Sequence, residues 1–372
     1  MLRVGVIILL TILGTGSVRS AEVNPAGQME WEKTVEAAKK EGQVNVYITG
    51  WGAVLNAGEF QKRYPEIRVV GVHGQGRQIS QRVLAERRAG KYLPDVVSAG
   101  LQTNYRTLHG TRALDPIKPA LILPEIVDKS KWFEERHRYA DPEGQYVFRY
   151  IGAVQPSTPA YNTKLVNPKE IESLWDFLKP KWKGKMEARD TRTPGPGSSP
   201  MKFFYYNPQL GPDFLKRLFG ETDMTFFRDF RSGTDWLARG KFAICFFCSG
   251  IGRAKSQGLP VDQLGTMKEG AALVSFHGSL ALMNRAPHPN AARVFINWYL
   301  SREGQIALQK ALVNLGDDPP DSLRIDIPKD SVSLIRRRMK GGTYIDLESG
   351  GGVDNRPGLK ILNDILVKRT KK

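Results

Sequence analysis

The chain has 372 residues, of which 41% are apolar, and its 55 Lys and Arg against 38 Asp and Glu give a formal net charge of +17. This length exceeds what one hydrophobic core usually organises, so two domains are expected. The positive charge favours anions near the surface, but the basic residues are scattered and no nucleic-acid-binding motif accompanies them. We therefore expect a two-domain α/β protein with no nucleic-acid partner.

The first 20 residues have the composition of a signal peptide. Arg3 precedes an apolar run over residues 4–13, and the small residue Ser20 ends the segment. Such a run is too short to cross a bilayer of roughly 30 Å as a helix. We expect cleavage after about Ser20 and export to the periplasm. Loss of Arg3 and Arg19, with no acid in residues 1–20, would lower the charge from +17 to +15.

The next part of the chain alternates helices with strands. Apolar residues at helical spacing predict an amphipathic helix over residues 29–40, with Gly42 just past its end. Short β-branched runs alternating with helical patterns predict a parallel sheet. The strands are expected at residues 44–49, 67–72 and 95–98, and the helices between them at 57–63 and 79–89.

A glycine-containing loop follows each of these three strands. In open α/β sheets, ligands bind outside the carboxyl ends of the strands, and glycine lets the backbone approach a ligand closely. Glycines that only form tight turns would explain any single loop equally well. The candidate ligand-binding residues in these loops are Thr49, Gly50, Trp51, Gly76, Arg77, Gln78, Ala99 and Gly100.

A second set of elements begins near residue 146. Two strand-like crossings, at 146–155 and 271–284, suggest that the chain leaves the first domain and later returns. We expect the first lobe to comprise residues 21–155 and 276–372, and the second lobe residues 156–275. The elements expected beyond residue 145 are strands at 146–154, 185–189, 242–247 and 271–283, and helices at 168–178, from 201, 213–218, 226–238, 291–300, from 302 and 359–367. The apolar periodicity that predicts helices and strands weakens between residues 316 and 352.

A loop rich in glycine, proline and hydroxyl residues precedes the helix that begins near Met201. Free N–H groups and serine hydroxyls at such a helix start favour an anion, and Arg192 adds a cation. A flexible loop with an ordinary helix cap is the alternative. The candidate residues here are Arg192, Thr193, Gly197, Ser198 and Ser199.

Cys245 and Cys248 are the only cysteines, and their spacing is that of a redox motif. They follow an apolar run that reads as a buried strand, where thiols pack easily. Successive strand residues alternate faces, so the two cysteines would diverge unless a turn intervenes. We favour a structural role and leave open whether they form a disulfide.

The stretch APHPNAARVFINWYLS at residues 286–301, followed by EGQ at 303–305, resembles the family 1 extracellular solute-binding proteins of ABC transporters. The similarity is closest to the branch of ferric-iron and thiamine binders. It extends to AAKKEG at 37–42, YNTKLV at 161–166 and WKGK at 182–185. The resemblance implies a two-lobed, type II periplasmic binding protein fold, with the ligand in the cleft and a membrane permease as partner.

The iron branch binds metal through a tyrosine pair after the buried second-lobe strand, a histidine and a carboxylate. Here Cys248-Ser249 follows Phe247, and Trp51 stands where the histidine would be sought. Because ferric iron prefers hard anionic oxygen ligands, we expect no metal. The synergistic-anion loop of that branch aligns instead with residues 191–199.

We therefore expect a monomeric, non-enzymatic binding protein without a cofactor, which takes a phosphate ester, phosphonate or carboxylate. Tyr161, Cys248 and Ser249 complete the candidate binding residues. The alternatives are an iron or thiamine binder of the same family, and an exported enzyme of the same fold that uses a cysteine nucleophile.

Overall fold

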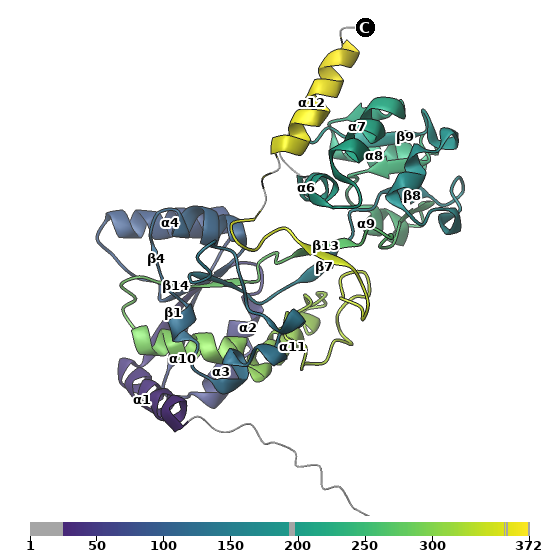
Figure 1. The fold of residues 1–372 in the computed structure, drawn as a ribbon. Helices are drawn as coiled ribbons and strands as arrows, with labels where there is room; N and C mark the ends of the chain where they lie inside the picture. Colours follow the sequence, from purple (N-terminus) through teal and green to yellow (C-terminus); the bar gives the residue numbers. More distant parts are fainter. Residues whose placement is uncertain (1–24, 193–197, 353, 355, 371–372) are drawn as a thin grey trace, which may run out of the picture.

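The computed structural model describes residues 25–192, 198–352, 354 and 356–370. The expected signal peptide lies outside these residues. Two lobes, each built around its own sheet, are joined by a third, smaller sheet (Figure 1). In the described part of the chain, no helix combines the length and apolar character needed to cross a bilayer.

The first lobe is an α/β layer structure around a seven-stranded mixed sheet of order β2-β1-β3-β14-β6-β5, with β4 paired to β14. β1, β2 and β3 are parallel, as the alternating pattern predicted, and β14 runs antiparallel to β3. The strands are β1 (Gln43–Ile48), β2 (Arg68–His73), β3 (Val96–Ala99), β4 (Leu114–Asp115), β5 (Arg138–Tyr139), β6 (Val147–Arg149) and β14 (Ser279–Met283).

Helices cover this sheet with apolar stripes. Ala38 of α1 and Phe295 and Trp298 of α10 are buried in the same core as the inward residues of β1. The principal helices and turns of the lobe are α1 (Pro25–Glu41), α2 (Ala53–Asn56), α3 (Glu59–Arg63), α4 (Gly76–Arg88), η1 (Gln102–His109), α5 (Pro124–Val127), α10 (Pro289–Leu300) and α11 (Arg302–Val313).

The second lobe surrounds a five-stranded sheet of order β10-β9-β11-β8-β12. β9, β10 and β11 are parallel, whereas β8 runs antiparallel to both of its neighbours. Its elements are β8 (Ala160–Asn162), β9 (Met186–Arg189), α6 (Ser198–Tyr206), α7 (Gly211–Glu221), β10 (Thr225–Phe227), α8 (Phe230–Ala238), β11 (Ile244–Phe246), α9 (Ile251–Ser256) and β12 (Val261–Gln263).

The connecting sheet consists of β7 (Ala153–Gln155), β13 (Ala271–Val274) and β15 (Tyr344–Asp346), in the order β15-β13-β7. β7 leads into the second lobe and β13 leads back. β15, from the segment with the weak sequence pattern, adds a third strand parallel to β13. Figure 1 shows this sheet between the two lobes.

Several expected elements are divided in the structure. The strand expected at 271–283 is β13 and β14 separated by a turn in which Phe276 has φ 48°. The helix expected at 168–178 is two short 3-10 turns, η5 (Pro168–Glu170) and η6 (Leu174–Leu178), because Asn167 and Ser173 each cap a new turn with their side chains. The first part of the helix expected at 226–238 is the strand β10.

The C-terminal helix α12 (Arg356–Thr370) lies against the second lobe, although we expected residues 276–372 to belong with the first. It contacts α6 and α7, and Leu362 is fully buried in the second-lobe core. The chain therefore crosses between the lobes a third time, after β15.

Candidate functional site

A cavity of about 720 Å³ lies between the lobes and is called the interlobe cavity below. Its walls come from the strand β7 and the residues after it, from the start of α6, from the β11–α9 turn, from the β13–β14 turn and from the C-terminal segment. They include Gln155, Ser157, Thr158, Pro200, Lys202, Phe246, Phe247, Cys248, Ile251, Asp262, Gln263, Phe276, Ile335, Arg336 and Glu348. Both lobes and the connecting sheet thus contribute to one space.

The charged residues of this cavity are unequally neutralised. Asp262 pairs with Lys255 at 2.7 Å, and Glu348 pairs with Arg149 at 3.2 Å. Within the described residues, neither Lys202 nor Arg336 forms an ion pair with a carboxylate. Because the acids are already paired and the cations are not, the cavity favours an anion.

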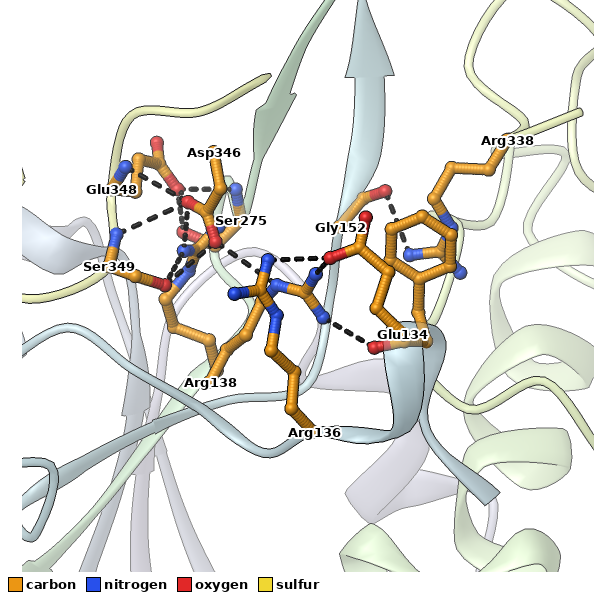
Figure 2. A network of polar contacts seen from close by, with 11 residues as sticks. Glu134, Arg136, Arg138, Gly152, Ser275, Arg338, Asp346, Glu348 and Ser349 are labelled. Carbon is orange, nitrogen blue, oxygen red and sulfur yellow. Dashed lines mark hydrogen bonds and ion pairs between the residues drawn. The ribbon is translucent and has the colours of Figure 1, made fainter. Parts of the chain in front are cut away.

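A buried polar network holds one wall of the cavity in place (Figure 2). Arg149 is fully buried and donates to Asp346 at 2.6 Å and to Ser349 Oγ at 2.8 Å. Ser275 donates its backbone N–H and its hydroxyl to Glu348 at 2.8 and 2.7 Å, so both carboxylates face this cluster. The network fastens the residues after β15 to the β13–β14 turn and fixes the position of Glu348.

The pKa of Asp346 is lowered to about 2 in this network. Burial by itself would raise that pKa, but the charge of Arg149 and the hydrogen bonds from Ser349 and Arg149 outweigh it. Asp346 is therefore ionised at neutral pH and compensates the buried Arg149 charge.

Aromatic side chains give the cavity its apolar surface. Phe246 lines it from the end of β11, Phe247 from the turn that follows, and Phe276 from the β13–β14 turn. Phe276 remains 39% exposed and lies 5.3 Å beneath the Arg336 guanidinium in a cation–π contact. A ligand with an apolar part beside its charge would fit such walls.

The sequence-predicted residues after β1 converge on His277 rather than on this cavity. Thr49 Oγ1 lies 2.9 Å from His277 Nδ1, and Trp51 is buried with an edge contact to the same ring. Gly50 has φ 72°, and a Cβ on it would collide with that ring. Desolvation lowers the pKa of His277, so its ring is neutral at pH 7. These contacts explain the glycine and the tryptophan by packing.

The residues predicted in the other first-lobe loops have structural contacts as well. A Cβ on Gly76 would lie 2.6 Å from Thr103 Oγ1, and one on Gly100 would lie 2.8 Å from a backbone oxygen. Gln78 caps α4 by accepting from the Gln75 N–H at 3.0 Å, and Ala99 is buried beside Ser279. Arg77 is exposed at the start of α4 and does not line the interlobe cavity.

The anion loop expected before α6 is only partly described. Thr193 and Gly197 lie outside the described residues, and Ser198 and Ser199 begin α6. Arg192 forms two bonds to Asp190, at 2.8 and 2.7 Å, and lowers the pKa of that carboxyl. Arg192 therefore faces a carboxylate beside α12 and not the interlobe cavity.

Of the remaining predicted second-lobe residues, only Cys248 lines the cavity. Tyr161 is buried in the core, and burial raises its pKa. The Ser249 carbonyl accepts from Thr234 at 2.9 Å. The assignment of these positions to ligand binding stays a prediction.

Sequence reasoning missed Lys202, Phe276, Arg336 and Glu348. Lys202 offered a signal, because it stands alone among apolar and aromatic residues of α6. Arg336 and Glu348 come from the stretch without periodicity, and long-range contacts bring them to the site: the Arg336 carbonyl accepts from the Val154 N–H at 2.8 Å, and Glu348 follows β15, which pairs with β13.

One group of side chains in the described chain has the composition of a metal site. A carboxylate oxygen of Glu187 and the sulfur atoms of Cys245 and Cys248 lie within 4.8 Å of one another. The cysteines are joined in a disulfide, however, and it is the thiolate form of cysteine that binds metals. This group therefore does not offer thiolate ligands in the oxidised protein.

Comparison with known proteins identified the fold through solved structures. A scan against protein-family models and a search of curated proteins each found no match. A Trichodesmium protein, IdiA or FutA, in complex with iron and citrate ligands matches with a TM-score of 0.60 at 16% identity, over 87% of this chain and 99% of that one.

Two further structures match over similar lengths. A ferric binding protein from Campylobacter jejuni has a TM-score of 0.53 at 15% identity, over 87% of this chain and 99% of its own. A substrate binding protein of an ABC transporter from Agrobacterium tumefaciens has a TM-score of 0.52 at 15% identity, over 87% and 94%. The α/β architecture in two lobes and these matches confirm that the chain has the fold of the type II periplasmic solute-binding proteins.

Proposed function

We propose that this chain is the periplasmic solute-binding component of an ABC importer, and that it captures a small organic anion in the interlobe cavity. The observation that carries the proposal is a pair of cations in the lining of that cavity, Lys202 and Arg336, neither of which forms an ion pair with a carboxylate of the described residues. Lys202 projects from α6 of the second lobe, and Arg336 comes from the C-terminal segment beside the connecting sheet. One anion placed between them would contact both sides.

This arrangement supplies a physical basis for a clamp. A ligand that touches both lobes stabilises the arrangement in which they are close, by the difference between its affinities for the closed and open states. The importer would then distinguish loaded from empty protein by shape. No covalent step and no cofactor is needed, and we assign no catalytic residue.

The chemical class follows from the lining. Arginine binds carboxylate and phosphate groups in a bidentate manner, and lysine adds a point charge. Phe246, Phe247 and Phe276 suit an apolar portion of the same ligand. A phosphate ester, a phosphonate or a carboxylate with such a portion combines both features.

Ferric iron is the second candidate, because the Trichodesmium and Campylobacter proteins of the same fold are described with iron or as iron binders. Iron prefers anionic oxygen ligands. The cavity lining contains no Tyr or His among the described residues, and its two carboxylates already pair with Lys255 and Arg149. Thiamine carries a positive charge, so the cations Lys202 and Arg336 would repel it.

A thermal-shift screen of the mature protein tests the proposal. Phosphate esters, phosphonates, carboxylates, thiamine and ferric iron with and without citrate would be compared. A ligand at a hundred times its dissociation constant adds about 2.7 kcal/mol to the free energy of unfolding. We expect stabilisation by an organic anion in the absence of iron. Stabilisation by iron or thiamine alone would contradict the assignment.

A further inference from the structure

Cys245 and Cys248 form a disulfide that borders the interlobe cavity. Cys245 is fully buried in β11, whereas Cys248 is half-buried and lines the cavity. Phe247, between them, has φ 63°, which is rare for an aromatic residue. This turn brings the two sulfur atoms together, although alternation along a continued strand would have separated them.

A carboxylic acid lies beside this disulfide without a hydrogen-bonding partner. Glu187 is fully buried on β9, and the parallel register of β9 and β11 places it directly opposite Cys245. Neither of its carboxylate oxygens has a hydrogen bond within the described residues. A buried polar group without a partner is costly, so its retention next to two sulfur atoms calls for an explanation.

The surroundings of Glu187 keep it protonated. Burial raises the pKa of Glu187 to about 8, and the charge of Lys241 opposes this only in part. The disulfide lies in a cluster that includes Leu237 and Ile251. A neutral acid of this kind can give a proton to a sulfur atom that leaves a disulfide, directly or through one water.

We propose that Cys245 and Cys248 form a redox-active disulfide that exchanges with small thiol compounds entering the interlobe cavity, with Glu187 as the proton carrier for Cys245. The inference concerns thiol chemistry and does not depend on which solute the protein transports. It rests on the accessibility of Cys248, the register of Glu187 and the turn at Phe247.

The exchange proceeds in two balanced steps. A thiolate attacks Cys248 Sγ, the bond between the two sulfurs breaks, and Cys245 Sγ leaves with the electron pair and takes a proton from Glu187. A second thiolate then attacks the small molecule's sulfur in the mixed disulfide and releases Cys248 as a thiolate. Two small thiols are oxidised to one disulfide, the protein disulfide is reduced to two thiols, and the protons of the two small thiols restore Glu187 and Cys248.

The first experiment measures the redox state of the native, full-length mature protein in mixtures of reduced and oxidised glutathione. Alkylation and mass spectrometry give the fraction reduced. We expect half-reduction in a mixture that contains both forms of glutathione, because Cys248 borders the cavity and an accessible disulfide is more easily reduced than one enclosed in a core. A disulfide that stays fully oxidised in every mixture while the protein remains folded would overturn the proposal.

Two single-cysteine variants locate the attacked sulfur. Cys245→Ser should form a mixed disulfide with glutathione at Cys248 when treated with oxidised glutathione. Cys248→Ser should react at least about tenfold more slowly, because access controls the reaction and Cys245 is fully buried. Equal rates, or no reaction of Cys248, would contradict the assignment of Cys248 as the accessible sulfur.

Glu187→Gln tests the proton carrier. At neutral pH we expect reduction by glutathione to slow by roughly a hundredfold, since general acid catalysis contributes on that order. Glu221→Gln, an exposed change on α7 of the same lobe, is the control and should react like the unaltered protein. An unchanged rate in folded Glu187→Gln would remove Glu187 from the mechanism. The two preceding experiments do not require this variant to fold.

Discussion

Glu187 also links the stability of the fold to pH. Its pKa is raised from 4.5 to about 8 by burial, so the folded protein binds this proton more tightly than the unfolded chain. A raised carboxyl pKa contributes most to stability below about pH 4.5, and this contribution is lost as the pH rises towards 8. We expect the free energy of unfolding to fall by roughly 5 kcal/mol across this window, since each pH unit between the two pKa values contributes about 1.4 kcal/mol.

Urea denaturation at a series of pH values tests whether Glu187 causes this loss of stability. The Glu187→Gln variant should show a clearly flatter dependence between about pH 5 and pH 9, since the amide does not titrate. Glu221→Gln should retain the slope of the unaltered protein. Parallel curves for Glu187→Gln and the unaltered protein would show that Glu187 does not titrate in this range.

The pKa of Asp346 is shifted in the opposite direction from that of Glu187, so its effect on stability has the opposite pH dependence. Its folded pKa of about 2 lies below the ordinary value of 3.8, so it stabilises the fold above about pH 4 and this contribution is lost as the pH falls towards 2. Asp346→Asn should remove about 2 kcal/mol of acid-dependent stability. It should also leave Arg149 buried with one charge less beside it.

Acid unfolding monitored by circular dichroism measures the effect of Asp346→Asn. Asp354→Asn is a suitable control, because Asp354 pairs locally with Arg356 outside the network of Figure 2. A loss of stability between pH 4 and pH 2 that is the same in Asp346→Asn and the unaltered protein would contradict this role of Asp346.

At the scale of elements, the C-terminal helix α12 packs on the second lobe, against α6 and α7. Leu362 is fully buried against that core. We expect Leu362→Ala to lower the free energy of unfolding by about 2–4 kcal/mol, through lost burial and a residual cavity. Leu334→Ala, at a position 67% exposed, should change it by less than about 0.5 kcal/mol.

Chemical denaturation of both variants tests the position of α12. Equal stabilities would mean that α12 does not pack on the second lobe in solution. A loss confined to Leu362→Ala would support the contact with α6 and α7.

The elements with strong periodicity could be predicted from the sequence. The helices at the N-terminus and at residues 289–300 and the three parallel strands follow from apolar spacing, and the structure confirms them within a few residues. The two crossings near residues 146 and 271 also indicated a chain that leaves a domain and returns. These features depend on local patterns, which a single sequence contains.

The remaining features depend on long-range contacts. The positive φ at Phe276 divides one apparent strand into two, and the positive φ at Phe247 brings the cysteines together. Residues 344–346 form the strand β15 because they pair with β13, although the surrounding segment has no apolar periodicity. The sequence indicated two lobes with a cleft between them, but the predicted first-lobe loop residues do not line the interlobe cavity. Arg336 and Glu348 could not be identified before the contacts of the C-terminal segment with β7 and β13 were known.

For the molecule as a whole, the three-stranded connecting sheet is where the lobes meet, and the interlobe cavity borders it. The contacts of Arg149 with Asp346 and Glu348 fasten one side of that junction to the first lobe, and Figure 2 shows the two carboxylates. Lys202 and Arg336, which form no ion pair with a carboxylate in the described part of the chain, bring positive charge to the cavity. Our proposal assigns ligand binding and lobe closure to this same small set of residues.

Titration calorimetry of the anion found in the screen would test this central claim most directly, on Lys202→Ala and Arg336→Ala. Lys216→Ala and Lys340→Ala remove exposed cations outside the cavity and serve as matched controls. Each cavity variant should weaken binding by about 1.5–3 kcal/mol, and the controls should bind like the unaltered protein. Unchanged affinity in both cavity variants would contradict the assignment of the interlobe cavity as the anion site.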